Sequence, residues 1–342
     1  MEIPLHRLVA AAVEACQLDN YQVEIFDPYF IQISDGVHTF QMGIGSSFGF
    51  APINTQCSVA NDKTRTLLLL NKAGFTTVEG QCFFTFQHPQ ATQGQLPEDA
   101  LAYAQTLTYP VFTKPNAGSL SKLATKVYSS EELLDQITAI QPTDRLLRVE
   151  KPIDLPEYRL VMIDGEFQYS CRKEIPKITG DGTQTVETLV TAFNEQATAR
   201  AQSMNEAFEP LDLHSVYLQN QLQAYNMSVQ SVLGKGIELQ LTPTPIARQG
   251  GTKQAYSETT SEATRSWLEQ VGKTLNLRLF GLDVFAKGPI DDPDNLIILE
   301  ANHNPIHRHV PHSKVLYMMR LVLRTYFEEQ MVIKNYRETP NH

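Results

Sequence analysis

The chain has 342 residues, of which 42% are hydrophobic and 19% are charged, so it can bury a sizeable core and a disordered chain is excluded. At roughly 150 residues per domain, this length predicts about two domains. The net charge of -10 argues against a nucleic-acid partner, because neutralising phosphates needs a basic face. The four cysteines Cys16, Cys57, Cys82 and Cys171 lie far apart and form no CxxC pair, so the sequence suggests neither a disulfide framework nor a thiolate zinc site.

The chain shows no segment for membrane insertion or export. Its uninterrupted apolar runs are far shorter than the roughly 18 residues that a membrane span needs. The first residues place Leu5, Leu8 and Val9 on one helix face, and Glu14 directly follows the apolar run, which is unlike a signal peptide. We therefore expect a soluble cytoplasmic protein.

Hydrophobic periodicity and turn signals predict a mixture of helices and strands. The first half is predicted as a helix over 5–16, strands over 21–26, 30–34 and 38–45, a helix over 63–73, strands within 76–86, a helix over 97–107, strands over 109–115 and 125–129, and a helix over 129–140. The second half is predicted as strands within 146–154 and 157–174, a helix over 186–202, a peripheral helical segment within 203–235, a strand over 235–243, a helix over 261–276, strands over 278–286 and 295–302, and a helix over 314–330. Because no strict βαβ rhythm appears, an α+β class with mixed sheets is favoured.

Three features of this pattern indicate chemistry. Lys63 opens a helix and Lys114 ends a strand. Residues 149–153 form an acidic hinge that Glu157 follows. Late in the chain Asp283 lies on one strand, and Glu300 and Asn302 end the next. Since Glu300 and Asn302 are two residues apart, they point the same way, and a hairpin would put Asp283 opposite them. Oxygen ligands of this kind suit magnesium held together with substrate phosphates.

These segments, in their order and spacing, resemble the ATP-grasp superfamily, and within it the ATP-grasp module of cyanophycin synthetase. The resemblance is carried by residues 41–45, 60–75, 111–119, 149–165, 179–190, 250–251, 280–286 and 298–313. It implies two α+β subdomains that grip ATP, beside a short N-terminal lobe. We expect the lobe at 1–58, a lid subdomain at 59–149 and a C-terminal subdomain with the metal and substrate site at 150–342. Because the long N-terminal extension and the Mur-ligase-like module are missing, the chain looks like a stand-alone ligase.

The resemblance also implies residue roles. The contacts to ATP would come from Lys63, Lys114, Glu150, Lys151, Ile153 and Glu157. Lys63 and Lys114 would contact the phosphates. The strand from Glu150 to Ile153 would meet the adenine edge, and Glu157 would hold the ribose hydroxyls. Two magnesium ions, with manganese as an alternative, would be held by Asp283, Glu300 and Asn302. Arg308 would handle the substrate carboxylate, and Arg159 and Arg172 would balance charge on the transferring phosphoryl group.

The implied reaction activates a carboxylate as an acyl phosphate, which an amine then attacks to leave an amide, ADP and phosphate. The substrates would be small molecules, amino acids or short peptides, without nucleic acid or membrane, and a homodimer is left open. Two alternatives remain. One is a ligase that modifies a ribosomal peptide or a protein terminus. The other is a nucleotide-binding regulatory or scaffold protein, because the phosphate-covering loop at 116–123 has one glycine where relatives have several.

Several motifs also have plainer explanations. Lys63 taken alone is typical of a solvated lysine at a helix start, and Arg159 can pair with Glu157 or Glu174. Residues 43–49 have the composition of a nucleotide loop but favour a tight loop beside the substrate cleft. A zinc site is disfavoured because prolines break any helix that would align His303, His307, His309 and His312. Residues 242–251 depart from the cyanophycin synthetase pattern, with Ile246 where asparagine is expected, so its substrates do not transfer.

Overall fold

The computed structural model describes residues 5, 7–27, 30–37, 39–43, 60–87, 94–118, 121–203, 207–305 and 310–338. The chain divides into two compact units, each built from separate stretches of sequence. The first unit contains Met1–Thr77, Tyr158–Cys171 and Tyr256–His342, and the second contains Val78–Glu157 and Arg172–Ala255. This division does not follow the three contiguous ranges expected from the sequence, because strands distant in the chain pair within one unit.

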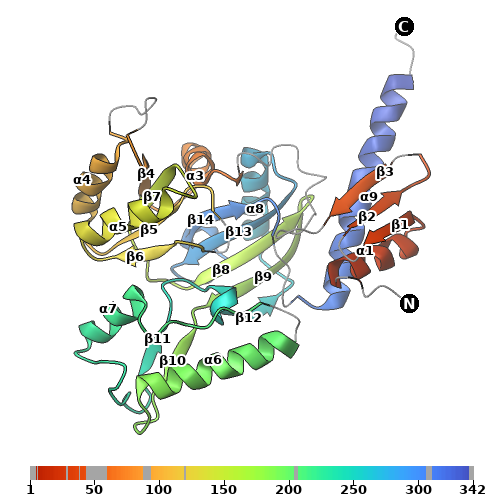
Figure 1. Ribbon diagram of the computed structural model, residues 1–342. Coiled ribbons are helices and arrows are strands. Elements are labelled where there is room, and N and C mark those ends of the chain that lie inside the picture. The colour runs from red at the N-terminus through yellow and green to blue at the C-terminus, as the bar shows by residue number, and fades with distance from the viewer. Residues whose placement is uncertain are drawn as a thin grey trace. The chain divides into compact units, whose positions relative to one another are not determined.

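The first unit is built on a five-stranded sheet with the order β12-β9-β8-β13-β14 (Figure 1). The strands of this sheet are β8 (Glu157–Ile163), β9 (Glu166–Glu174), β12 (Thr252–Ser257), β13 (Leu279–Ala286) and β14 (Leu296–Asn302). Glu157, residues 172–174 of β9 and residues 252–255 of β12 belong to the second unit. The turn between β8 and β9 uses Asp164 and Gly165 at φ +50° and +79°, and an Asp-Gly pair is favoured in hairpin turns because both central residues need a positive φ. The helices α3 (Lys63–Lys72) and α8 (Glu262–Leu275) contact each other, and α3 also contacts β14.

A second layer of the first unit joins the two ends of the described chain. A three-stranded antiparallel sheet contains β1 (Gln22–Asp27), β2 (Phe30–Ser34) and β3 (Thr39–Gly43). The helices α1 (Arg7–Leu18) and α9 (His312–Glu338) lie side by side next to it (Figure 1). One core cluster links Val9, Ile31 and Met318 to Val161 and Leu279 of the five-stranded sheet. This apolar core fixes the strands that carry the late carboxylates.

The second unit contains a four-stranded sheet with the order β4-β7-β5-β6. Its elements are β4 (Gly80–Phe84), α4 (Pro97–Leu107), β5 (Val111–Pro115), β6 (Thr125–Val127), α5 (Ser130–Ile140) and β7 (Leu146–Glu150). The helices α4 and α5 cover one face (Figure 1), where Leu147 and Val149 pack against Ala100, Leu133 and other apolar residues of the two helices. Since side chains alternate along a strand, Arg148 and Glu150 belong to the opposite face.

The rest of the second unit has a small core of its own. A two-stranded antiparallel sheet pairs β10 (Lys177–Thr179) with β11 (Glu238–Gln240). The helices α6 (Val186–Ser203) and α7 (Val216–Ala224) pack on it through Val186, Val190 and Leu222. Short 3₁₀ turns occur at Ala247–Gln249 in this unit and at Pro293–Asn295 in the first.

Most predicted elements are confirmed, with boundaries shifted by a few residues. The sequence did not predict β10 or β12, because β10 has three residues and β12 is a polar edge strand whose residues are half-buried or exposed. Within 203–235 the helix α7 spans nine residues, and the other described residues outside α6 form turns and loops. Among the described residues, no helix combines the length and the apolar character needed to cross a bilayer.

Candidate functional site

The predicted hairpin of late carboxylates is present. β13 and β14 pair antiparallel, with Asp283 opposite Glu300 and Gly281 opposite Asn302. The register shifts after Asp283, where the strand pairing skips a residue, and such bulges commonly redirect side chains at functional sites. The Asn302 side-chain amide donates to Glu300 Oε1 at 3.1 Å. The sequence prediction that Glu300 and Asn302 point the same way, with Asp283 opposite, is therefore confirmed.

Arg159 on β8 clamps Asp283 with two hydrogen bonds. Its Nε and Nη2 atoms donate to Asp283 Oδ1 and Oδ2, each at 2.6 Å, and Asp283 is fully buried. Burial by itself lowers the pKa of Arg159, but the Asp283 carboxylate raises that pKa well above its usual value. The guanidinium stem passes over Gly281, where an added Cβ would lie 3.5 Å from Arg159 Cδ and 2.8 Å from Pro305 Cβ. A bidentate pair of this kind is among the strongest side-chain interactions.

The alternative partners expected for Arg159 are wrong. Glu157 pairs with Lys173, and Glu174 lies 2.8 Å from Arg172. The physical reason is the strand order, which places β8 beside β13, a strand more than 100 residues away in sequence. Local spacing along β8 and β9 holds no information about that neighbour.

Lys63 adds a second cation to the same unit. It is the first residue of α3, whose N-cap Asp62 accepts a hydrogen bond from the Arg65 backbone N–H at 3.0 Å. Its Nζ atom lies 3.9 Å from Glu300 Oε2, and its side chain is 11% exposed. Lys63 is therefore not the solvated lysine that its position at a helix start would suggest.

The second unit holds a separate buried cluster on the sheet face opposite α4 and α5. Glu150 Oε2 lies 2.9 Å from Lys114 Nζ, and Glu150 Oε1 accepts from Arg148 Nε at 2.6 Å. Arg148 Nη2 also donates to the Gly80 carbonyl at 3.3 Å. All three charged residues are at most 5% exposed. This cluster contains two of the residues expected to contact a nucleotide.

The remaining predicted residues of the second unit lie near the end of β7 and beyond it. Lys151 is exposed, and its backbone N–H donates to the Glu79 carbonyl at 3.0 Å. Ile153 is half-buried in the irregular segment that joins β7 to β8, and Glu157 is buried. Arg172 is 43% exposed. Arg308 lies outside the described residues, as do most of the predicted loop at 43–49 and Ser119.

The oxygen donors of the β13–β14 hairpin fit a magnesium ion. Two carboxylates and one side-chain amide on neighbouring strands are ligand types that Mg²⁺ takes from proteins. Lys63 and Arg159 already offset the charges of Glu300 and Asp283, so an added cation would need a further anion such as a phosphate. The described residues hold no group of three or more His, Cys, Asp or Glu with metal-binding geometry. Of the four histidines weighed for zinc, His312 pairs with Glu14 at 2.7 Å, and His307 and His309 lie outside the described residues.

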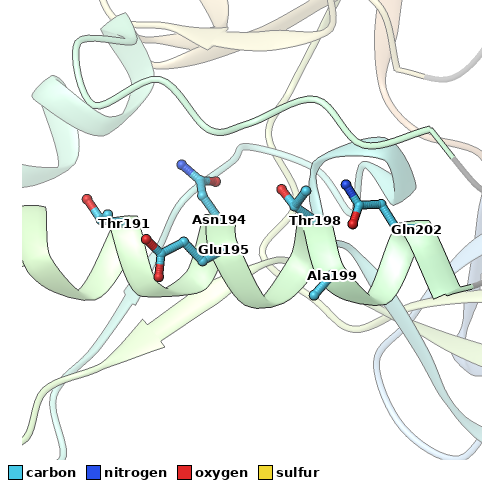
Figure 2. Close-up of a pocket in the computed structure, with 6 residues that line it drawn as sticks. All are labelled: Thr191, Asn194, Glu195, Thr198, Ala199 and Gln202. Atoms are coloured by element: carbon cyan, nitrogen blue, oxygen red, sulfur yellow. The ribbon is translucent and has the colours of Figure 1, made fainter.

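A hollow on the surface of the second unit shares no lining residue with either charged cluster. Figure 2 shows that its labelled residues all come from one helix, α6. They are Thr191, Asn194, Glu195, Thr198, Ala199 and Gln202. Asn194 exchanges two hydrogen bonds with the Leu211 backbone, at 3.1 and 2.9 Å, so its amide holds the following loop. This hollow contains none of the predicted site residues.

Sequence reasoning missed Arg148 and Lys173. Lys173 pairs with Glu157, the residue expected to bind a ribose. Arg148 is a charged residue inside an otherwise buried strand of sequence LLRVE, where Leu147, Val149 and Glu150 are also buried. An arginine within such a buried run is unusual, and this signal would have indicated the cluster.

The fold matches a class of known structures, although no family model matches the chain. A bifunctional glutathione synthetase from Pasteurella multocida superposes with a TM-score of 0.50 and 19% sequence identity, covering 95% of this chain and 44% of that one. The chain has the ATP-grasp fold, in which α and β elements form mixed, largely antiparallel sheets. The expected α+β class and ATP-grasp fold are confirmed.

Curated relatives show the particular resemblance. The cyanophycin synthetase of Crocosphaera subtropica is 24% identical over 296 residues, which cover 84% of this chain and 32% of that protein. The bifunctional glutathione biosynthesis protein of Enterococcus faecalis is 24% identical over 259 residues, which cover 74% of this chain and 33% of that protein. The chain spans about a third of the length of these relatives. It resembles the ATP-grasp ligases, as its motifs predicted, and cyanophycin synthetase among them.

Proposed function

We propose that this protein is an ATP-dependent carboxylate–amine ligase that forms an amide bond and releases ADP and phosphate. The observation that carries the proposal is the meeting of Asp283, Glu300 and Asn302 on one hairpin, with Lys63 and Arg159 against the two carboxylates. The set combines oxygen donors for a metal ion with two cationic side chains, and metal ions and cations are the groups by which proteins stabilise phosphoryl transfer. The similarity to a cyanophycin synthetase and a glutathione biosynthesis protein supports the same chemistry.

The hairpin cluster would hold magnesium and the phosphates that it accompanies. Asp283, Glu300 and Asn302 would ligate the metal, which when bound neutralises negative charge on the transferring phosphoryl group. Lys63 would contact a phosphate oxygen. Arg159 holds Asp283 by both oxygens, so we propose that it acts mainly by positioning that ligand.

The second unit would bind the nucleotide through residues of β5, β7 and the segment after β7. Lys114 would contact phosphate, and the stretch from Glu150 through Lys151 to Ile153 would meet the adenine edge. Glu157 would accept hydrogen bonds from the ribose hydroxyls while Lys173 holds its carboxylate. Two further arginines, Arg172 and Arg308, would offset charge near the acyl phosphate and the substrate carboxylate.

The reaction needs positioning and charge neutralisation more than covalent chemistry by the protein. An oxygen of the substrate carboxylate attacks the γ-phosphorus of ATP, the bond from that phosphorus to the bridging oxygen of ADP breaks, and an acyl phosphate forms. The nitrogen of the amine then attacks the acyl carbon and loses a proton, and the carbon–oxygen bond breaks to release phosphate. No serine or cysteine nucleophile takes part. We place the enzyme in amino-acid or small-peptide metabolism of the cytoplasm.

The proposal is tested by phosphate release on a matrix of amino acids and dipeptides, with mass spectrometry of the product. A condensation product formed with one ADP per amide bond is expected. Turnover only with a polypeptide acceptor would instead favour the ligase of peptide or protein termini. ATP binding without ADP release on any pair would favour a nucleotide-binding regulatory protein.

Glu300→Gln tests the metal assignment. The amide keeps the size of the side chain but removes its negative charge, so we expect ADP formation to fall by at least about 10²-fold, the scale typical of losing one electrostatic group. Circular dichroism should match the wild type. Turnover like that of the wild type in this variant would exclude Glu300 as a metal ligand.

Lys114→Ala tests the phosphate assignment in the other unit. Removing this ammonium group should raise the KM for ATP by at least about tenfold, because a charge-assisted hydrogen bond contributes roughly 1.5–3 kcal/mol. The KM values for the acid and the amine should change much less. An unchanged dependence on ATP would contradict the role of Lys114.

A further inference from the structure

The buried cluster of the second unit shares one carboxylate between two cations. Lys114 and Arg148 are cross-strand neighbours in the antiparallel pair of β5 and β7, and Glu150 lies two residues after Arg148 on the same face. Arg148 Nε donates to Glu150 Oε1 at 2.6 Å, and Lys114 Nζ lies 2.9 Å from Glu150 Oε2. The formal charges of these three side chains sum to +1.

The surroundings hold Glu150 and Arg148 in place. Gly80 lies opposite Glu150 on β4, and a Cβ there would come 2.6 Å from Glu150 Cγ and 2.7 Å from the Val149 carbonyl oxygen. The Gly80 carbonyl in turn accepts from Arg148 Nη2 at 3.3 Å. The close approach that glycine permits therefore packs the Glu150 stem and anchors the arginine at the same position.

The net positive charge of this buried cluster is destabilising, and an anionic ligand can offset it. Charged side chains that are at most 7% exposed are expensive unless balanced, and within this cluster one carboxylate faces two cations. A lysine ammonium has three donors, and Glu150 needs one of them. An anion beside Lys114 would complete the balance. If Arg148 were absent, Lys114 and Glu150 would form a neutral pair with less attraction for an anion.

We infer that Arg148 is a positioning residue for phosphate binding. It occupies one oxygen of Glu150 and offsets the charge of that carboxylate, which leaves Lys114 as the cation that attracts a nucleotide phosphate. Arg148 itself does not contact the nucleotide. This inference rests on the proposed function, because it takes ATP as the ligand of the second unit. The inference uses no contact made by the first unit.

Calorimetric binding of ATP and of adenosine to the full chain tests the inference, with the ratio of the two affinities as the readout. Arg148→Gln makes the formal charge of the cluster zero, so ATP affinity should fall about tenfold while adenosine affinity stays within about twofold. Arg148→Lys keeps the charge and should keep most of the ratio, although it loses the fork geometry. If Arg148 contributed only to stability, Arg148→Gln would leave the ratio of ATP affinity to adenosine affinity unchanged, and Arg148→Lys would have no loss to restore.

A double variant separates charge from folding. Arg148→Gln combined with Glu150→Gln returns the charge of the cluster to +1 through Lys114 alone, so the ratio of ATP to adenosine affinity should recover. The inference fails if Arg148→Gln lowers both affinities equally, or if the double variant does not restore the ratio. In those cases ATP binding by the wild type would still support the proposed ligase. A wild-type chain that binds neither ATP nor adenosine would overturn both.

Discussion

Replacing Arg159 by glutamine should destabilise the first unit far more than a matched change at the surface. In the wild type both oxygens of Asp283 accept from the guanidinium at 2.6 Å, and the exposed fractions of the two side chains are 12% and 1%. Glutamine is shorter and neutral, so Asp283 would keep a buried charge without its ionic partner. Removing one partner of a buried ion pair costs about 3–5 kcal/mol.

The chain offers a control with the same chemistry at higher exposure. Arg278 also donates twice to one aspartate, with Nε and Nη2 at 2.8 and 2.6 Å from Asp164 Oδ1, and both side chains are about one-third exposed, at 33% and 34%. Exposed pairs contribute about 0–1 kcal/mol, because water and salt screen them. Arg278→Gln should therefore cost at least about 2 kcal/mol less than Arg159→Gln.

Urea unfolding followed by tryptophan fluorescence measures this difference in the free energy of unfolding of the first unit. The chain has a single tryptophan, Trp267, which lies on α8 and makes an edge contact with Phe75 at a ring separation of 5.7 Å. Its signal reports the first unit, which contains both arginines. Adding Asp283→Asn to Arg159→Gln should recover part of the loss, since the uncompensated charge is then gone. Equal losses for the two single variants would refute the argument that burial decides the cost.

Two further predictions concern the protonation of particular groups. Burial, with a smaller effect of Asp19, raises the pKa of the Cys16 thiol to about 12. At pH 8 about one thiol in 10⁴ is therefore ionised. Because the thiolate is the reactive form, iodoacetamide should modify Cys16 only after denaturation. Peptide mass spectrometry checks this, and rapid labelling of the native chain would contradict it. Hydrogen bonds from the backbone N–H groups of Gln184 and Thr183 lower the pKa of Asp181 to about 2. Its stabilising contribution should be complete above about pH 4 and lost as pH falls through about 2, and a carboxyl titration by NMR with its midpoint near 4 would contradict this.

The sequence predicted the local structure and part of the site, because both depend on spacing along the chain. The helix predicted over 129–140 is present as α5, and the hydroxyl of its N-cap residue Ser129 accepts from the Glu132 N–H at 3.2 Å. The pairing of Asp283 with Glu300 followed from two strands that are consecutive in the sequence and that pair as an antiparallel hairpin. The ATP-grasp fold was expected from the resemblance of the motifs, in their order and spacing, to that superfamily, and it is confirmed.

Tertiary structure decided which charged groups meet. Arg159 pairs with Asp283, 124 residues away, because β8 lies beside β13 in the sheet, and no periodicity encodes that neighbour. The same holds for Lys114 and Arg148, which the pairing of β5 with β7 brings to one carboxylate. The division into two discontinuous units has the same origin, since strands from distant segments complete each sheet. Side-chain type and local spacing set what each element presents, and only the packing of strands sets which partner it meets.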